Sequence, residues 1–165
     1  MPDILHKIDT SYYQSNASSC WYASYCMLFR WKGIPVSSIR ERIEKKGLDY
    51  RDFWTKGLPD DKYADVRDAL GLVSFPRLQF SRLAGNAEVL AAALQKFGPF
   101  WAALSAPSEH AVVIAGVIPA AGIVYVVNPW SVGENAAQQE AFTLGELQCR
   151  LGAKEHLAGV QMFMG

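Results

Sequence analysis

Charge of either sign is scarce in this sequence, and neither sign predominates. The chain has 165 residues, with 16 Lys and Arg against 16 Asp and Glu. Charged residues make up 19% of it, below the roughly 25% of an average globular domain. Because the composition gives no basic face to hold a phosphate backbone, we do not expect nucleic acid as a partner. Hydrophobic residues at 50% exclude a disordered chain.

Long hydrophobic runs and paired cysteines are also absent. The most apolar stretch, residues 100–117, is interrupted by Pro107 and the polar residues that follow it. No segment approaches the roughly 20 apolar residues of a membrane-spanning helix, so we expect no membrane partner. The three cysteines are odd in number and lack metal-ligand spacing, which argues against a disulfide framework and a zinc site. We expect neither a metal nor a cofactor.

The length and the even composition predict a single domain spanning residues 1–165. No internal repeat, low-complexity tract or linker divides the chain. The first half is typical of helices, because semi-apolar stretches end at Gly or Pro and begin at capping residues such as Asn86. Ser38 and Glu41 have the spacing of a capping box. The predicted helices cover residues 20–31, 38–46, 61–70 and 86–97.

After Pro99 the sequence changes to short apolar runs separated by turn residues, which is typical of strands. Two of these runs are joined by only four residues, a connection that favours an antiparallel hairpin. Thr143 and Glu146 again have capping-box spacing and predict one more helix. The sequence therefore predicts an α+β fold, with N-terminal helices packed on a C-terminal antiparallel sheet. The predicted strands cover residues 100–106, 110–118, 123–128 and 157–163.

Cys20 stands where a polar loop runs into the first predicted helix. The unpaired N–H groups and the positive end of the helix dipole favour a thiolate there, so we expect the pKa of Cys20 to be lowered. A thiolate is the nucleophilic form of cysteine. Cys26 lies deeper in the same helix, and we interpret it as a small buried hydrophobic residue.

A thiolate nucleophile needs a histidine, and His110 is the best placed of the three in the sequence. It opens a strongly apolar strand, so its ring is expected at the end of the sheet. The next strand ends at Asn128, eighteen residues later, and antiparallel pairing would return this end toward His110. An amide oxygen there can hold one ring nitrogen and leave the other for the thiol.

The order of Gln14, Cys20 followed by Trp21, His110 and Asn128 resembles that of the papain-like cysteine proteases. In that family a glutamine precedes a Cys-Trp pair at a helix start, and a histidine and an Asn or Asp follow on the sheet. The sequence is most similar to small bacterial members: the avirulence-effector cysteine proteases and the peptidases that remove double-glycine leaders from bacteriocins.

This resemblance implies a papain-like fold and a cysteine endopeptidase that works through a thioester. It implies that Cys20 is the nucleophile, His110 the general acid and base, and Asn128 the residue that orients the imidazole. The Gln14 side chain and the Cys20 backbone N–H would form the oxyanion hole. Trp21 and Trp130 adjoin two of these residues, so we expect them to form cleft wall that shields the site from water.

The Cys-His-Asn arrangement also serves other acyl transfers, so a glutamine deamidase and a peptidoglycan amidase stay open as alternatives. A non-catalytic interaction module is a third possibility. Residues 1–10 lack the pattern of a secretory signal peptide. Together with the resemblance to effectors, this predicts a bacterial toxin delivered by a specialised secretion system into the cytoplasm of another cell. Its expected partners are a protein substrate and a cognate immunity protein that blocks the cleft.

Overall fold

A computed structural model describes residues 2–74, 86–130 and 135–164 of the chain. Its centre is a sheet of seven strands in which every pair is antiparallel, with the order β2-β7-β3-β4-β5-β6 and β1 paired to β4. The strands are β1 (Ile4–Leu5), β2 (Val73–Ser74), β3 (Phe100–Leu104), β4 (His110–Ile118), β5 (Ile123–Asn128), β6 (Gln138–Thr143) and β7 (Val160–Met162).

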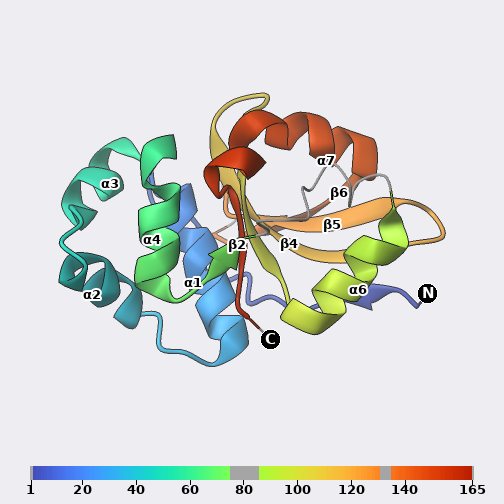
Figure 1. The fold of residues 1–165 in the computed structure, drawn as a ribbon, viewed down its shortest axis with the longest axis horizontal. Helices are drawn as coiled ribbons and strands as arrows, with labels where there is room; N and C mark the ends of the chain where they lie inside the picture. Colours follow the sequence, from blue (N-terminus) through green and yellow to red (C-terminus); the bar gives the residue numbers. More distant parts are fainter. Residues whose placement is uncertain (1, 75–85, 131–134, 165) are drawn as a thin grey trace.

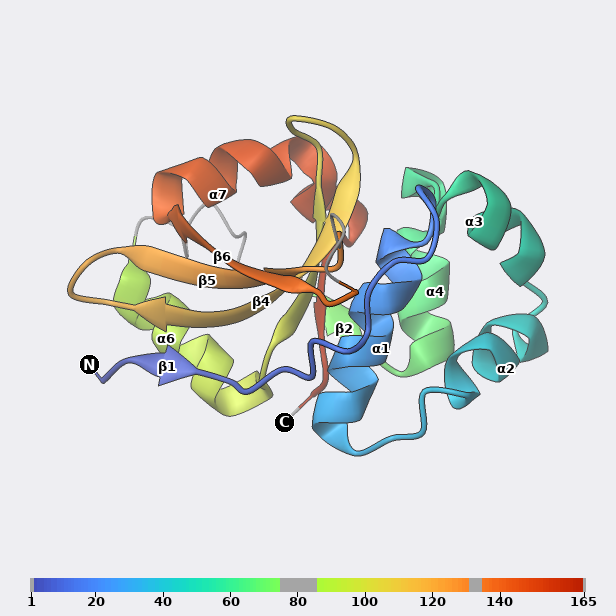
Figure 2. The same ribbon diagram turned by 180° about the vertical axis from the view of Figure 1, so that it is seen from behind.

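The helices of the first half form a group beside one end of the sheet, and α1 lies between that group and the strands (Figure 1). Figure 2 shows the segment after β1 running across α1 from the opposite side. This arrangement confirms the predicted α+β fold, with N-terminal helices on a C-terminal antiparallel sheet. The helices are α1 (Cys20–Lys32), α2 (Ser38–Lys45), α3 (Tyr50–Lys56), α4 (Tyr63–Leu70), α6 (Ala87–Phe97) and α7 (Leu144–Leu151), with short 3₁₀ turns η1 (Asp60–Lys62) and η2 (Gly152–Leu157).

Side chains in the middle of β4 alternate between two hydrophobic cores, as the pleat of a strand requires. Val112 and Ile114 pack in the core that includes residues of α6 and α7. Val113 and Ala115 point the other way and pack with Met27 of α1. Because both faces of β4 are covered, the strand is apolar along its length, and its two end residues, His110 and Ile118, are partly exposed.

One capping prediction and one strand boundary need correction. The strand predicted over residues 157–163 is shorter, because Leu157 ends η2 and β7 spans Val160–Met162. The helix after Pro35 exists, but Ser38 does not cap it: the N-cap is Ser37, which makes no side-chain capping bond, and the Ser38 hydroxyl donates to the Pro35 carbonyl. The sequence also gave no indication of α3 or β6. By contrast, Asn86 accepts from the backbone N–H groups of the first turn of α6, as predicted.

Candidate active site

Cys20 is the first residue of α1, and the loop before it is held by a serine. The Ser19 hydroxyl accepts from the backbone N–H groups of Ser15 and Asn16, at 3.2 and 3.3 Å. Ser19 occupies the N-cap position but makes no side-chain capping bond to the helix. The first N–H groups of α1 are therefore left without a side-chain cap at the position of the Cys20 thiol.

His110 begins β4, and Asn128 ends β5, the other strand of the hairpin. The hairpin register pairs Val113 with Val127, which brings Asn128 to the same end of the sheet as His110. His110 Nε2 lies 2.6 Å from Asn128 Oδ1. The predicted meeting of these two side chains is therefore confirmed. With Nε2 held by the amide oxygen, Nδ1 is the ring nitrogen left for another partner.

Asn128 makes two further hydrogen bonds, and both fix its amide. Its Oδ1 also accepts from the Trp130 backbone N–H at 2.9 Å. Its Nδ2 donates to Glu140 Oε1 of β6 at 3.2 Å. The sequence analysis missed Glu140, since β6 itself was not predicted.

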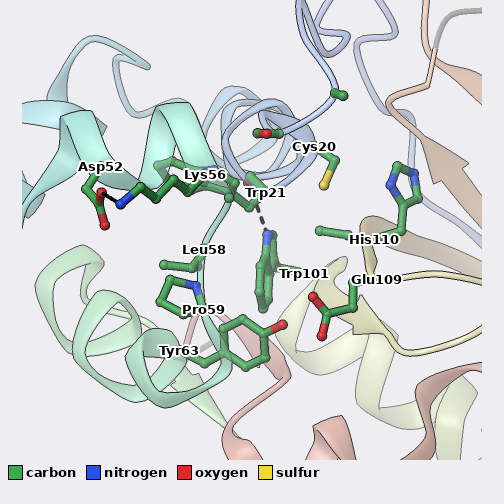
Figure 3. A pocket seen from close by; sticks show the side chains of 14 residues that line it. Cys20, Trp21, Asp52, Lys56, Leu58, Pro59, Tyr63, Trp101, Glu109 and His110 are labelled. Carbon is green, nitrogen blue, oxygen red and sulfur yellow. Dashed lines mark hydrogen bonds and ion pairs between the residues drawn. The ribbon is translucent and has the colours of Figure 1, made fainter.

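Cys20 and His110 line the same pocket, which has a volume of about 340 Å³. Figure 3 shows the two side chains on one rim of this pocket, with Trp101 and Glu109 beneath them. The opposite wall comes from the helical half of the molecule and includes Tyr63. The pocket therefore lies where the start of α1, the start of β4 and the helical group meet, and it is open to a substrate beside the thiol.

Burial raises the pKa of the Cys20 thiol above its usual value. Backbone N–H groups of Ala111, Trp21 and Cys20 itself oppose this effect, but burial outweighs them. The expectation of a lowered pKa from the helix N-terminus alone is therefore wrong, because desolvation of the thiolate raises the pKa more than the backbone N–H groups lower it. A reactive thiolate at this position requires a further positive partner.

The two tryptophans lie in different environments. Trp21 lines the Cys20 pocket but is only 2% exposed, and its indole N–H donates to the Phe53 carbonyl. Trp130 is 49% exposed and lines two other pockets, one with His110 and Asn128 and the other with Gln14 and the loop that follows it. Trp21 is thus placed as a wall of the thiol pocket, whereas Trp130 stands beside the histidine and its amide partner.

Gln14 lies beside this site but does not line the Cys20 pocket. Its backbone N–H donates to the Pro129 carbonyl at 3.0 Å, which fastens the loop before α1 to the end of β5. Its side-chain Nε2 donates to the Asn16 carbonyl at 3.0 Å, and its Oε1 is buried without a partner. The amide nitrogen has a second hydrogen, so the oxyanion role of Gln14 stays a prediction.

Three further properties of the described residues concern cysteines, metal sites and membrane-spanning helices. All three cysteines are free thiols, with Cys26 buried and Cys149 exposed. Among residues 2–74, 86–130 and 135–164, no group of three His, Cys, Asp or Glu side chains could hold a metal ion. No helix in the described part of the chain is long and apolar enough to cross a membrane.

Comparison with known families agrees with this geometry. A family model described as papain-like cysteine protease AvrRpt2 matches residues 4–144, which include the start of α1, β4 and the end of β5. The chain belongs to this family. A comparison with curated proteins found no matching relative. The AvrRpt2-type chain is therefore a papain-like cysteine protease, a hydrolase of the effector kind.

Proposed function

We propose that this AvrRpt2-type protease cuts protein chains with Cys20 as nucleophile, His110 as general acid and base, and Asn128 as the residue that orients the imidazole. The observation that carries the proposal is the shared pocket of Cys20 and His110, together with the 2.6 Å contact between His110 Nε2 and Asn128 Oδ1. The contact leaves Nδ1 for the thiol proton.

The reaction begins when the Cys20 thiol gives its proton to His110 Nδ1. The sulfur attacks the carbonyl carbon of the scissile peptide, and the π electrons move to the carbonyl oxygen. The backbone N–H of Cys20 and the Gln14 amide stabilise this oxyanion. The carbon–nitrogen bond then breaks, and His110 protonates the departing amine. Water, deprotonated by His110, attacks the resulting thioester; the carbon–sulfur bond breaks and the acid is released.

The raised pKa of Cys20 makes His110 indispensable to this sequence. Burial disfavours a lone thiolate, so the anion forms in quantity only when an imidazolium beside it offsets the desolvation cost. Because Nε2 is bonded to Asn128, Nδ1 is the ring nitrogen left to carry the proton taken from the thiol. The positive partner that the buried thiol needs is therefore supplied by the residue that accepts its proton.

The test compares wild type with Cys20→Ala after incubation with a bacterial lysate, with new protein N-termini identified by mass spectrometry. We expect new termini that share one sequence context and appear only with wild type. Termini that appear equally with Cys20→Ala would contradict the proposal. A mass increase of about one unit in intact proteins without new termini would indicate glutamine deamidation, and release of wall fragments a peptidoglycan amidase; either result would also contradict it.

We also propose that the protease is a bacterial toxin, delivered by a specialised secretion system into the cytoplasm of another cell. The match to the AvrRpt2 family of papain-like cysteine proteases supports this proposal. The producing cell would then need an immunity protein that covers the pocket.

Coexpression of Cys20→Ala with each gene that neighbours the toxin gene tests this partner. We expect one product to form a stable complex and, with wild-type toxin, to slow iodoacetamide alkylation of Cys20 without changing that of Cys149. The absence of any such product would contradict the immunity proposal and leave the protease assignment intact.

A further inference from the structure

Glu140 is linked to His110 through the side chain of Asn128. It lies on β6 opposite Val126 of β5, two pairs away from the Asn128–Gln138 pair and therefore on the same face of the sheet. Its carboxylate accepts from Asn128 Nδ2 at 3.2 Å, while Asn128 Oδ1 contacts His110 Nε2 at 2.6 Å. Three side chains from three adjacent strands thus form one line that ends at the imidazole.

The partners of Asn128 decide which way its amide faces. The Trp130 backbone N–H, at 2.9 Å, can only donate, so the atom opposite it must be an oxygen. An ionised Glu140 carboxylate can only accept, so the atom opposite it must be the amide nitrogen. If the amide were turned over, its NH2 group would face the Trp130 backbone N–H and its oxygen would face the Glu140 carboxylate. Both contacts therefore favour the orientation in which Oδ1 faces His110.

We infer that Glu140 is a positioning residue for the proposed reaction: by holding Asn128 Nδ2, it keeps Asn128 Oδ1 on His110 Nε2 and so presents His110 Nδ1 to Cys20. The inference rests on the proposed function. Its chemistry is specific to an amide at position 128, because a carboxylate there would face the carboxylate of Glu140.

This dependence predicts that exchanging the donor and the acceptor between positions 128 and 140 restores the contact. Asn128→Asp places two carboxylates at the 3.2 Å contact, where their repulsion turns one of them away or protonates it. Glu140→Gln alone keeps an oxygen that can accept from Asn128, so its effect is small. The double variant Asn128→Asp with Glu140→Gln restores a donor and an acceptor in reversed order. Glu140→Leu removes the acceptor altogether, so that the Trp130 backbone N–H is the one contact of the two that still favours this orientation of the amide.

The experiment measures alkylation of Cys20 by iodoacetamide at pH 7, with Cys149 in the same molecule as the exposed reference thiol. We expect Cys20 alkylation to fall about tenfold in Asn128→Asp and in Glu140→Leu, the effect of losing a charge-assisted hydrogen bond. The double variant should recover to within about threefold of wild type, a range set by the spread of such hydrogen-bond energies. Gln139→Leu, on the exposed face of the same strand, is the matched control and should match wild type.

Two results would overturn the inference: Glu140→Leu with wild-type Cys20 reactivity, or a double variant no more reactive than Asn128→Asp. A purely structural role for Glu140 would lower thermal stability without producing this rescue, so the melting temperature of each variant is measured as well. Failure of the proposed function looks different, because Cys20 of wild type would then be alkylated no faster than Cys149.

Discussion

At the scale of single residues, the proposed oxyanion role of Gln14 depends on one hydrogen atom of its side-chain amide. One Nε2 hydrogen is donated to the Asn16 carbonyl, and the proposed oxyanion role would require the other. The backbone bond from Gln14 to Pro129 fixes the loop near Asn128 independently of the side chain. The side chain can therefore be removed while the loop keeps this anchor.

Gln14→Ala should lower kcat about 10²- to 10³-fold, the usual cost of losing one oxyanion donor. The measurement uses a protein substrate identified from the new N-termini, with Ser15→Ala as the control. Alkylation of Cys20 by iodoacetamide should not change, because that displacement forms no oxyanion. Unchanged turnover, or an equal loss in both assays, would contradict the oxyanion role.

At the scale of elements, a buried network of hydrogen bonds and a ring stack holds the first half of α1 against the sheet. The Tyr25 ring stacks on Trp101 of β3 with centroids 4.7 Å apart, and its hydroxyl donates to Gln161 Oε1 of β7 at 2.7 Å. The Trp101 indole N–H donates to the Trp21 carbonyl, at the start of α1. The helix that carries Cys20 is thus fastened to two strands by directed contacts as well as by apolar packing.

Tyr25→Phe should keep the stack but leave Gln161 Oε1 without its donor in the core. We expect the free energy of unfolding to fall by about 1–2 kcal/mol, the cost of an unsatisfied buried acceptor. Urea titration of both proteins measures the difference. Tyr13→Phe, at a side chain that is 36% exposed, is the control and should change stability by less than about 0.5 kcal/mol. Equal stability of Tyr25→Phe and wild type would contradict this part of the account.

Elements with a strong apolar pattern could be predicted from the sequence, whereas polar ones could not. The hairpin of β4 and β5 is apolar with a short connection, so the meeting of His110 and Asn128 followed from it. β6 reads QQEAFT and has a single buried residue, Phe142, because it lies at the edge of the sheet. Without that strand, no pattern placed Glu140 beside Asn128.

The short helix α3 was not predicted and the direction of the Cys20 pKa shift was predicted wrongly, for different reasons. α3 has only seven residues, too few for a helical period to be seen, and it begins at an Asp49 cap that accepts from Asp52. The pKa depends on how deeply the thiol is buried, which is set by tertiary packing. Local sequence shows the helix N-terminus but not the desolvation that outweighs it.

At the scale of the whole molecule, one buried lysine joins the two sides of the pocket. Lys154 has a side chain that is 5% exposed and ion pairs with Asp60 of the helical side and with Glu109, just before β4. Burial would lower the pKa of Lys154, but hydrogen bonds to these two carboxylates raise it well above its usual value. The partners lie 94 and 45 residues away in the sequence, so no local pattern predicted the bridge.

Lys154→Met should lower the free energy of unfolding by about 1–3 kcal/mol, because two carboxylates lose their shared cation. Their exposure of 41% and 79% lets them hydrate, which keeps the loss below that of a fully buried pair. Lys62→Met, which removes an exposed ion pair, is the control and should cost less than about 1 kcal/mol.

The pH dependence of this loss has a definite sign. A raised folded-state pKa stabilises the fold at every pH below the unfolded value of about 10.4, and the contribution is lost only at higher pH. Denaturant titrations at pH 6 and pH 9 should therefore give the same difference between Lys154→Met and wild type. A difference that shrinks by pH 9 would show that Lys154 loses its proton in the folded protein.

In the proposed mechanism Cys20 is an activated nucleophile because His110 offsets the desolvation cost of a buried thiolate. The most direct test is the rate of iodoacetamide alkylation of Cys20 relative to Cys149 at pH 7, in wild type and in His110→Ala. We predict that Cys20 reacts faster than Cys149 in wild type. In His110→Ala it should react more slowly than Cys149, since burial raises the pKa of the unpaired thiol. Equal Cys20 rates in the two proteins would contradict the account.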